Sequence, residues 1–219
     1  GFERNLVPGE IADQVLLAQN DMGRRVTNIV GMGQGEPFLN YRNVLAALRI
    51  LNDPQGLAIG ARHISISTCG VIEGIERFSH EPKQFTLAVS LHAARQSTRD
   101  LLMPRVARYK LPDLKQALMR YVKRTNRRVT LEYVMIDNVN DTDRDLEALN
   151  AFCSDLLCHV NLIPINAVEG SPFQPSDPLV LDQWVQSIQS HGKEATVRDS
   201  RGSDIDGACG QLKRTKCFT

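Results

Sequence analysis

Short apolar runs alternate with amphipathic runs along this 219-residue chain, and this alternation constrains the fold more than any other feature. The apolar runs are rich in β-branched residues, as in buried strands, whereas the runs between them repeat apolar residues at helical spacing. Strands and helices that alternate in this way form a parallel sheet covered by helices. Six such units favour a barrel-like α/β fold, with a doubly wound open sheet as the alternative. The expected strands are residues 26–30, 63–67, 85–90, 129–135, 160–164 and 193–198.

The expected helices lie between these strands. Thr142, followed three residues later by Asp145, has the spacing of a capping box at a helix start. Everything after Asp199 is glycine-rich and irregular. A chain of this length can bury one large core, so we expect one core domain over residues 1–198, followed by a tail at 199–219. The expected helices are residues 8–25, 40–51, 70–79, 111–124, 142–156 and 181–188.

The composition is that of an ordinary soluble globular protein, with 42% hydrophobic and 23% charged residues. No run of about 18 apolar residues is present, so no membrane span is expected. The first residues have no apolar segment typical of a signal peptide. The five cysteines form no Cys-x-x-Cys pair, which disfavours a disulfide framework and favours a reducing cytoplasm.

The segment Gly31-Met32-Gly33-Gln34-Gly35-Glu36-Pro37 follows the first expected strand. Three glycines at alternate positions allow the backbone to bend sharply and to approach a ligand closely. The carboxylate of Glu36 suits a small polar ligand that carries a positive charge. The segment lacks the spacing and the Lys-Ser/Thr pair of the phosphate-binding motifs. A tight turn between a strand and a helix, with no ligand, is the simpler alternative.

Polar residues stand after the carboxyl ends of most of the expected strands, which is where parallel α/β proteins bind ligands. Each could be a plain helix cap or turn former, but five clusters at one edge predict a binding site. His92 is a candidate base or ligand contact, and Cys209 lies in a loop that could reach the same edge. The clusters are Gly35-Glu36, Ser67-Thr68-Cys69-Gly70, Ser90-Leu91-His92, Asn166 and Asp199-Ser200-Arg201.

Positive charge is concentrated between Arg95 and Arg128, where eleven lysines and arginines face only two acids, Asp100 and Asp113. Such a block can follow a phosphate backbone. A solvated helix face is the commoner explanation for a run of charge.

Several motifs together resemble the radical SAM RNA methyltransferases of the RlmN/Cfr type, and the resemblance covers essentially all 219 residues. It implies a partial (β/α)6 barrel of the TIM-like radical SAM kind. The motifs are Gly33-Gln34-Gly35-Glu36-Pro37, Ser67-Thr68-Cys69-Gly70, Ser90-Leu91-His92, the stretch from Glu132 to Asp141, Leu162-Ile163-Pro164-Ile165-Asn166, the stretch from Asp204 to Leu212 and the opening Gly1-Phe2-Glu3-Arg4-Asn5-Leu6.

This resemblance implies methylation of carbon 2 of an adenine in 23S rRNA and in certain tRNAs. In the family a 4Fe–4S cluster, fed by an electron donor, reduces S-adenosylmethionine to a 5′-deoxyadenosyl radical. That radical activates a methyl group carried by a cysteine, and Cys209 matches this position. Glu36 would hold the ammonium group of the cofactor's methionine. The other matching cofactor contacts are Gly35, Ser67, Ser90, Leu91, His92 and Asn166.

The family's cluster ligands form a Cys-x-x-x-Cys-x-x-Cys motif just upstream of the stretch that matches Gly1-Phe2. We therefore expect the N-terminal part to be missing from this chain, and the chain alone to bind no cluster and to be inactive. The strand at residues 26–31 should then have an unpaired edge. A methyltransferase acting on adenine carbon 8, as in Cfr-type proteins, and a non-catalytic remnant that binds RNA or cofactor are the alternatives.

Overall fold

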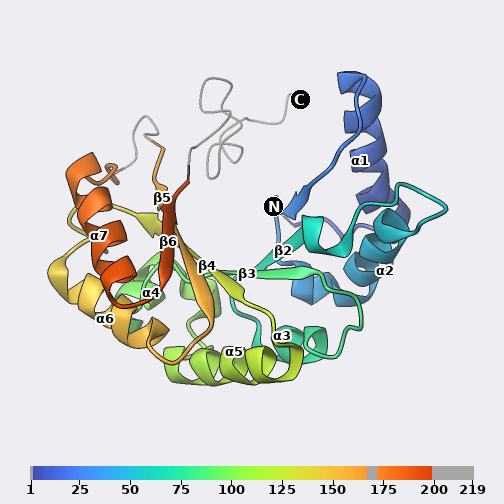
Figure 1. Cartoon of the computed structure of the whole chain (residues 1–219). Coiled ribbons are helices and arrows are strands. Elements are labelled where there is room, and N and C mark those ends of the chain that lie inside the picture. The colour runs from blue at the N-terminus through green and yellow to red at the C-terminus, as the bar shows by residue number, and fades with distance from the viewer. Residues whose placement is uncertain (1, 167–171, 199–219) are drawn as a thin grey trace.

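The computed structural model describes residues 2–166 and 172–198. Its centre is a six-stranded sheet in which each strand pairs in parallel with the next one along the chain. Figure 1 shows the sheet curving, with the helices arranged around its outer side. The strands are β1 (Ile29–Gly31), β2 (Ile64–Thr68), β3 (Thr86–Ser90), β4 (Val129–Met135), β5 (Cys158–Pro164) and β6 (Glu194–Val197).

The sequential strand order distinguishes the two folds that the sequence left open. A doubly wound sheet reverses its strand order at a switch point, with helices on both faces, whereas a barrel adds strands in chain order with all helices outside. The observed order β1-β2-β3-β4-β5-β6 is that of a barrel. In the described part of the chain β1 and β6 are the two end strands, so the barrel is partial and the doubly wound alternative is wrong.

Seven α-helices and three short 3₁₀-helices lie in the described residues. All the α-helices expected from periodicity are present. The helices are α1 (Pro8–Met22), η1 (Pro37–Asn40), α2 (Tyr41–Asn52), η2 (Ala61–His63), α3 (Ile72–Phe78), α4 (Gln96–Leu102), η3 (Pro104–Val106), α5 (Leu111–Thr125), α6 (Asp143–Cys153) and α7 (Pro178–Ser190).

Several expected element bounds shift by two or three residues, for example the end of α1 and the starts of β5 and α7, and three further local differences are informative. The first strand is β1 at Ile29–Gly31 instead of residues 26–30. Helix α4 was not expected, because its seven residues are too few and too polar to show a helical period. Thr142 is the N-cap of α6, but its hydroxyl donates to the carboxylate of Asp145 rather than accepting a backbone N–H, so the capping box is wrong.

The hydrophobic core lies between the sheet and the outer helices. Alternate strand residues face the helices and are fully buried, for example Leu87, Leu131 and Val160. The helices present matching apolar stripes, such as Leu114 and Leu118 of α5. Because side chains alternate along a strand, the remaining strand residues line the concave inner face. That face is largely polar and includes Ser67, Ser90, Thr130, Glu132, His159, Asn161 and Thr196.

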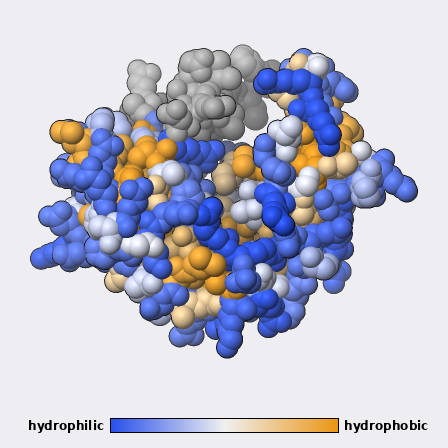
Figure 2. Space-filling model, in the orientation of Figure 1, coloured by the Kyte–Doolittle hydropathy of each residue, from blue (hydrophilic) through white to orange (hydrophobic). Residues whose placement is uncertain are grey.

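The face seen in Figure 2 is mainly hydrophilic, with apolar residues in several separate patches, one of which lies at the α1–α2 end of the molecule. Among the described residues, none of the helices combines the length and the apolarity that crossing a membrane would need.

Candidate functional site

The turn after β1 brings the carboxylate of Glu36 to the end of β2. Gly35 adopts a φ of +99°, a left-handed conformation that a side chain would strain. Oε1 of Glu36 accepts hydrogen bonds from the Thr68 hydroxyl at 2.8 Å and from the Phe38 N–H at 3.0 Å. Oε2 accepts from the Cys69 N–H at 2.7 Å. Glu36 therefore joins the glycine-rich turn, the start of η1 and the end of β2.

These three bonds limit what else Glu36 can bind. A carboxylate offers about four lone-pair positions, and three of those on Glu36 are occupied by the protein itself. The prediction that Glu36 holds an ammonium group therefore depends on the remaining acceptor capacity of Oε2, and it stays a prediction.

Two of the predicted serines meet on the concave face. The Oγ atoms of Ser67 on β2 and Ser90 on β3 are 3.3 Å apart. Ser90 in turn lies opposite Glu132 in the β3–β4 register. The predicted contacts at the ends of these strands are thus neighbours in space.

His92 adopts an unusual and well-supported conformation just after β3. Its φ of 56° lies in the left-handed region, which non-glycine residues rarely adopt. The N–H groups of Leu91 and His92 both donate to the carbonyl of Glu132, at 2.9 and 3.1 Å. The side-chain amide of Asn140 donates to the His92 carbonyl at 2.7 Å. These three bonds hold the strained backbone in place.

The His92 imidazole is neutral, with its proton on Nε2. Nδ1 accepts a hydrogen bond from the Val134 N–H at 3.2 Å, so the proton of the neutral ring resides on the other nitrogen. Burial, helped by the charge of Arg99, lowers the pKa of His92 to about 4. The ring can therefore donate a hydrogen bond through Nε2 but is a weak base.

Asn140 is a buried residue of this site that the sequence did not reveal. Its amide nitrogen also donates to the Val134 carbonyl at 2.6 Å, and its Oδ1 accepts from the Ile136 N–H at 2.8 Å. The signals were its place shortly after a strand, which is also typical of an ordinary turn, and its position within the family-like stretch from Glu132 to Asp141.

Arg99 shows that the basic segment is not one continuous surface. Its side chain is fully buried, and Nη2 donates to the Cys69 carbonyl at 2.7 Å. Other cations of the segment pair with acids: Arg95 with Asp145 and Arg120 with Glu76. Arg99, which solvent cannot reach, therefore fits neither of the two interpretations of the Arg95–Arg128 block, a phosphate-binding surface or a solvated helix face.

The described cysteines do not fit a 4Fe–4S cluster. Cys69 follows β2 at the site edge, whereas the buried Cys153 and Cys158 stand at the end of α6 and the start of β5. Burial and the Glu36 carboxylate raise the pKa of the Cys69 thiol to about 11, which disfavours the thiolate that binds iron. No group of three or more His, Cys, Asp or Glu side chains in the described part could hold a metal ion.

The remaining predicted residues belong to the last two strands and the tail. Asn166 follows the end of β5, at the same edge of the sheet as Ser90. After β6, the Arg198 guanidinium contacts the Met32 sulfur at 3.4 Å and so reaches from the last strand to the glycine-rich turn. Cys209, the cluster Asp199-Ser200-Arg201 and the tail at 199–219 lie outside the described residues.

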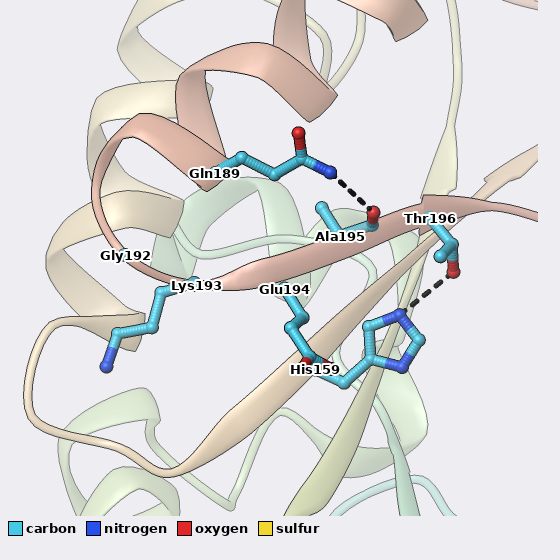
Figure 3. A pocket seen from close by; sticks show the side chains of 7 residues that line it. All are labelled: His159, Gln189, Gly192, Lys193, Glu194, Ala195 and Thr196. Atoms are coloured by element: carbon cyan, nitrogen blue, oxygen red, sulfur yellow. Dashed lines mark hydrogen bonds between the residues drawn. The ribbon is translucent and has the colours of Figure 1, made fainter.

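Two cavities in the described structure lie at opposite ends of the sheet. One, of about 610 Å³, lies beside β1 and is lined by the Gly31–Pro37 turn together with α1 and the residues before it. The other, of about 510 Å³, lies at the opposite edge of the sheet, where β5 and β6 begin (Figure 3). In it the His159 ring contacts the Thr196 hydroxyl at 2.9 Å. None of the predicted ligand contacts lines this second cavity.

The fold and the edge cluster define a partial α/β barrel with a candidate ligand site at the carboxyl ends of its parallel strands. Comparison with known proteins agrees with this class, since residues 1–149 match the family model of the radical SAM superfamily. The chain belongs to the radical SAM superfamily.

The chain is also similar to several individual proteins. It is 45% identical over 214 residues to a probable dual-specificity RNA methyltransferase RlmN of Alkaliphilus metalliredigens, covering 98% of this chain and 61% of that protein. The protein with the same description from Moorella thermoacetica is 46% identical over 218 residues, with 97% and 62% covered. The chain thus spans less than two thirds of the length of these relatives.

Solved structures are similar to this chain as well. A radical SAM methyltransferase from Sphaerobacter thermophilus superposes with a TM-score of 0.92 at 46% identity, over 96% of this chain and 63% of that one. SuiB of Streptococcus suis, solved bound to S-adenosylmethionine, reaches a TM-score of 0.65 over 97% of this chain and 49% of that one. At 14% identity this second likeness shows the fold alone.

Proposed function

We propose that this chain is the core of a cytoplasmic RNA methyltransferase that uses S-adenosylmethionine to methylate carbon 2 of adenine in 23S rRNA and tRNA. The observation that carries the proposal is the cluster of Glu36, Ser67, Ser90 and His92 at one edge of the sheet. The relatives described as dual-specificity RNA methyltransferases support RNA as the substrate.

The edge residues fit the cofactor in type and charge. Glu36 would attract the ammonium group of the methionine part, and the neutral His92 would offer a hydrogen-bond donor. Gly35 leaves the backbone open to a close approach, and Ser67, Ser90, Leu91 and Asn166 complete the proposed contacts. When bound, S-adenosylmethionine supplies the methyl group and the source of the radical that an unreactive ring carbon requires.

Two further parts of the proposal concern groups outside the described residues. Cys209 is proposed as the catalytic residue that carries the methyl group to the adenine. The 4Fe–4S cluster, with its electron donor, is proposed to bind through a Cys-x-x-x-Cys-x-x-Cys motif, which the given sequence does not contain, and the described cysteines do not fit the cluster. The chain alone should therefore be inactive. Anaerobic reconstitution followed by iron and sulfide analysis should find no cluster, and about four irons per chain would contradict this.

Activity is best tested in a chimera in which these residues replace the matching segment of the Alkaliphilus relative, which supplies the rest of the protein. Nucleoside mass spectrometry of 23S rRNA and tRNA treated with this chimera should find 2-methyladenosine. The Cys209→Ala chimera should form none. Exclusive formation of 8-methyladenosine would overturn the carbon-2 assignment, and full activity of the Cys209→Ala chimera would overturn the role of Cys209.

A further inference from the structure

Arg99 is a fully buried cation that none of the predicted cofactor contacts includes. It belongs to α4, the short helix that follows β3, and its Nη2 donates to the Cys69 carbonyl at 2.7 Å. Within the described part of the chain, its Nε and Nη1 are buried without a hydrogen-bond partner. Burying a guanidinium in this way costs free energy, and an apolar side chain of similar size would fill the same space at a lower cost. Packing alone therefore does not favour an arginine at this position.

The turn after β2 leaves room for this guanidinium. Gly70 has a φ of +96°, and a Cβ at this position would lie only 3.1 Å from Nη2 of Arg99. A side chain there would crowd the guanidinium against the carbonyl that it binds. Hydrogen bonds from a charged donor are about twice as strong as neutral ones. The bond from Arg99 therefore fixes the position of Cys69 at the end of β2.

Cys69 links Arg99 to Glu36. The Cys69 carbonyl accepts the bond from Arg99, and the Cys69 N–H donates to Oε2 of Glu36 at 2.7 Å. The preceding residue, Thr68, donates its hydroxyl to Oε1 of Glu36 at 2.8 Å. Two of the three protein hydrogen bonds that orient the Glu36 carboxylate thus come from the segment that Arg99 anchors. Burial and the charge of Arg99 lower the pKa of His92, so the guanidinium also lies near the end of β3.

We propose that Arg99 is a positioning residue of the cofactor site. By holding the Cys69 carbonyl, it fixes the Thr68-Cys69 segment and, through that segment, the orientation of the Glu36 carboxylate toward the ammonium group of the cofactor. The effect is indirect, because Arg99 acts on Glu36 through Cys69 and does not contact the cofactor itself. This inference rests on the proposed function, since that function places the ammonium group at Glu36.

The test compares S-adenosylmethionine with its desamino counterpart, which lacks only the ammonium group, by titration calorimetry on the 219-residue chain. The wild-type chain should bind the ammonium form roughly tenfold more tightly or better, which is the range for one hydrogen bond to a charged group. Arg99→Met should lose most of this preference, whereas its affinity for the desamino form should change little. Arg99→Lys keeps a charged donor and should retain part of the preference. Arg105→Met, which removes an exposed arginine of η3, is the control and should retain all of it.

A merely structural role for Arg99 would weaken the binding of both forms alike. Equal losses in a folded Arg99→Met variant, or an unchanged preference, would therefore overturn this inference and leave the proposed function standing. If Arg99→Met does not fold, Arg99→Gln replaces it, and its shorter, neutral side chain should also reduce the preference. A wild-type chain that binds both forms equally would overturn the inference together with the role of Glu36. A wild-type chain that binds no S-adenosylmethionine would overturn the proposed function as well.

Discussion

His92 and Asn140 show how single residues shape this site. The φ of 56° at His92 is strained for a residue with a side chain, and Asn140 supports it from a loop 48 residues away in sequence. Asn140 is completely buried and uses both nitrogen donors and its oxygen on backbone groups. The backbone conformation at His92 thus depends on a residue whose two side-chain N–H donors are both already used.

Replacing Asn140 with alanine should destabilise the protein strongly. The change leaves the Ile136 N–H and the carbonyls of His92 and Val134 without their partner in a buried place. We expect a loss of about 2–4 kcal/mol in the free energy of unfolding, since buried polar groups without partners cost 1–3 kcal/mol each. Urea denaturation measures this loss. The exposed Asn20→Ala in α1 is the control and should change stability by less than about 0.5 kcal/mol.

The His92 pKa of about 4 predicts a pH dependence of stability. An unfolded chain would have a His92 pKa near 6.5, so between these values the unfolded state binds more protons than the folded state. The contribution of His92 is therefore fully present above pH 6.5 and is lost as the pH falls toward 4. Urea denaturation between pH 4 and 8 should show this loss in the wild-type chain. It should be reduced in His92→Asn, because asparagine tolerates the left-handed backbone and does not titrate, and an identical pH profile would contradict the prediction.

At the scale of elements, the contact between α3 and η1 sets the position of the glycine-rich turn. Gly74 of α3 lies directly against Phe38 of η1, and an added Cβ would overlap the Cβ and the ring of Phe38. Phe38 is in turn bonded through its N–H to Glu36. The absence of a side chain at position 74 therefore lets η1 pack closely enough to hold Glu36 at the end of β2.

Replacing Gly74 with alanine should lower stability although alanine favours helices. Overpacking typically costs about 1–3 kcal/mol, which exceeds the gain of about 1 kcal/mol in helix propensity. Because Phe38 must move, the affinity for S-adenosylmethionine should fall as well. Thermal unfolding and titration calorimetry measure the two effects. Gly9→Ala in α1 adds a Cβ that meets nothing within 4 Å, so it should be neutral or stabilising.

At the scale of the whole molecule, the open end of the sheet at β1 is the main unpaired feature. In the described structure β1 pairs only with β2, and Val30 is 57% exposed on it. The adjoining cavity of about 610 Å³ is lined by apolar residues of α1, α2 and β1. An exposed strand edge beside an apolar groove favours pairing with another chain.

We expect the isolated chain to self-associate through this edge as its concentration rises. Sedimentation analysis should show dimers or larger species for the wild-type chain and fewer of them for Val30→Lys, because a charged side chain disfavours edge pairing. Leu179→Lys, which adds the same charge at an exposed position of α7, is the control and should leave association unchanged. A strictly monomeric wild-type chain at high concentration would show that this edge is protected.

The sequence alone was enough for the order of the elements and for a parallel sheet covered by helices, and it favoured a barrel without excluding a doubly wound sheet. These features depend on local periodicity and on the general rule that parallel strands end together. The sequence did not predict helix α4, which is too short to show a clear period, and it placed the first strand a few residues before β1.

The tertiary structure alone decided which side chains meet. Glu36 accepts hydrogen bonds from Thr68 and Cys69, which lie more than 30 residues later in the sequence. Arg198 contacts Met32, from which it is separated by 166 residues. The burial of Arg99 and the hydrogen bond from the Asn161 amide to Glu132 likewise follow from packing between distant elements. Periodicity indicates which face of a helix or strand is apolar but not which other element packs against that face. Contacts between residues far apart in sequence therefore depend on the tertiary structure.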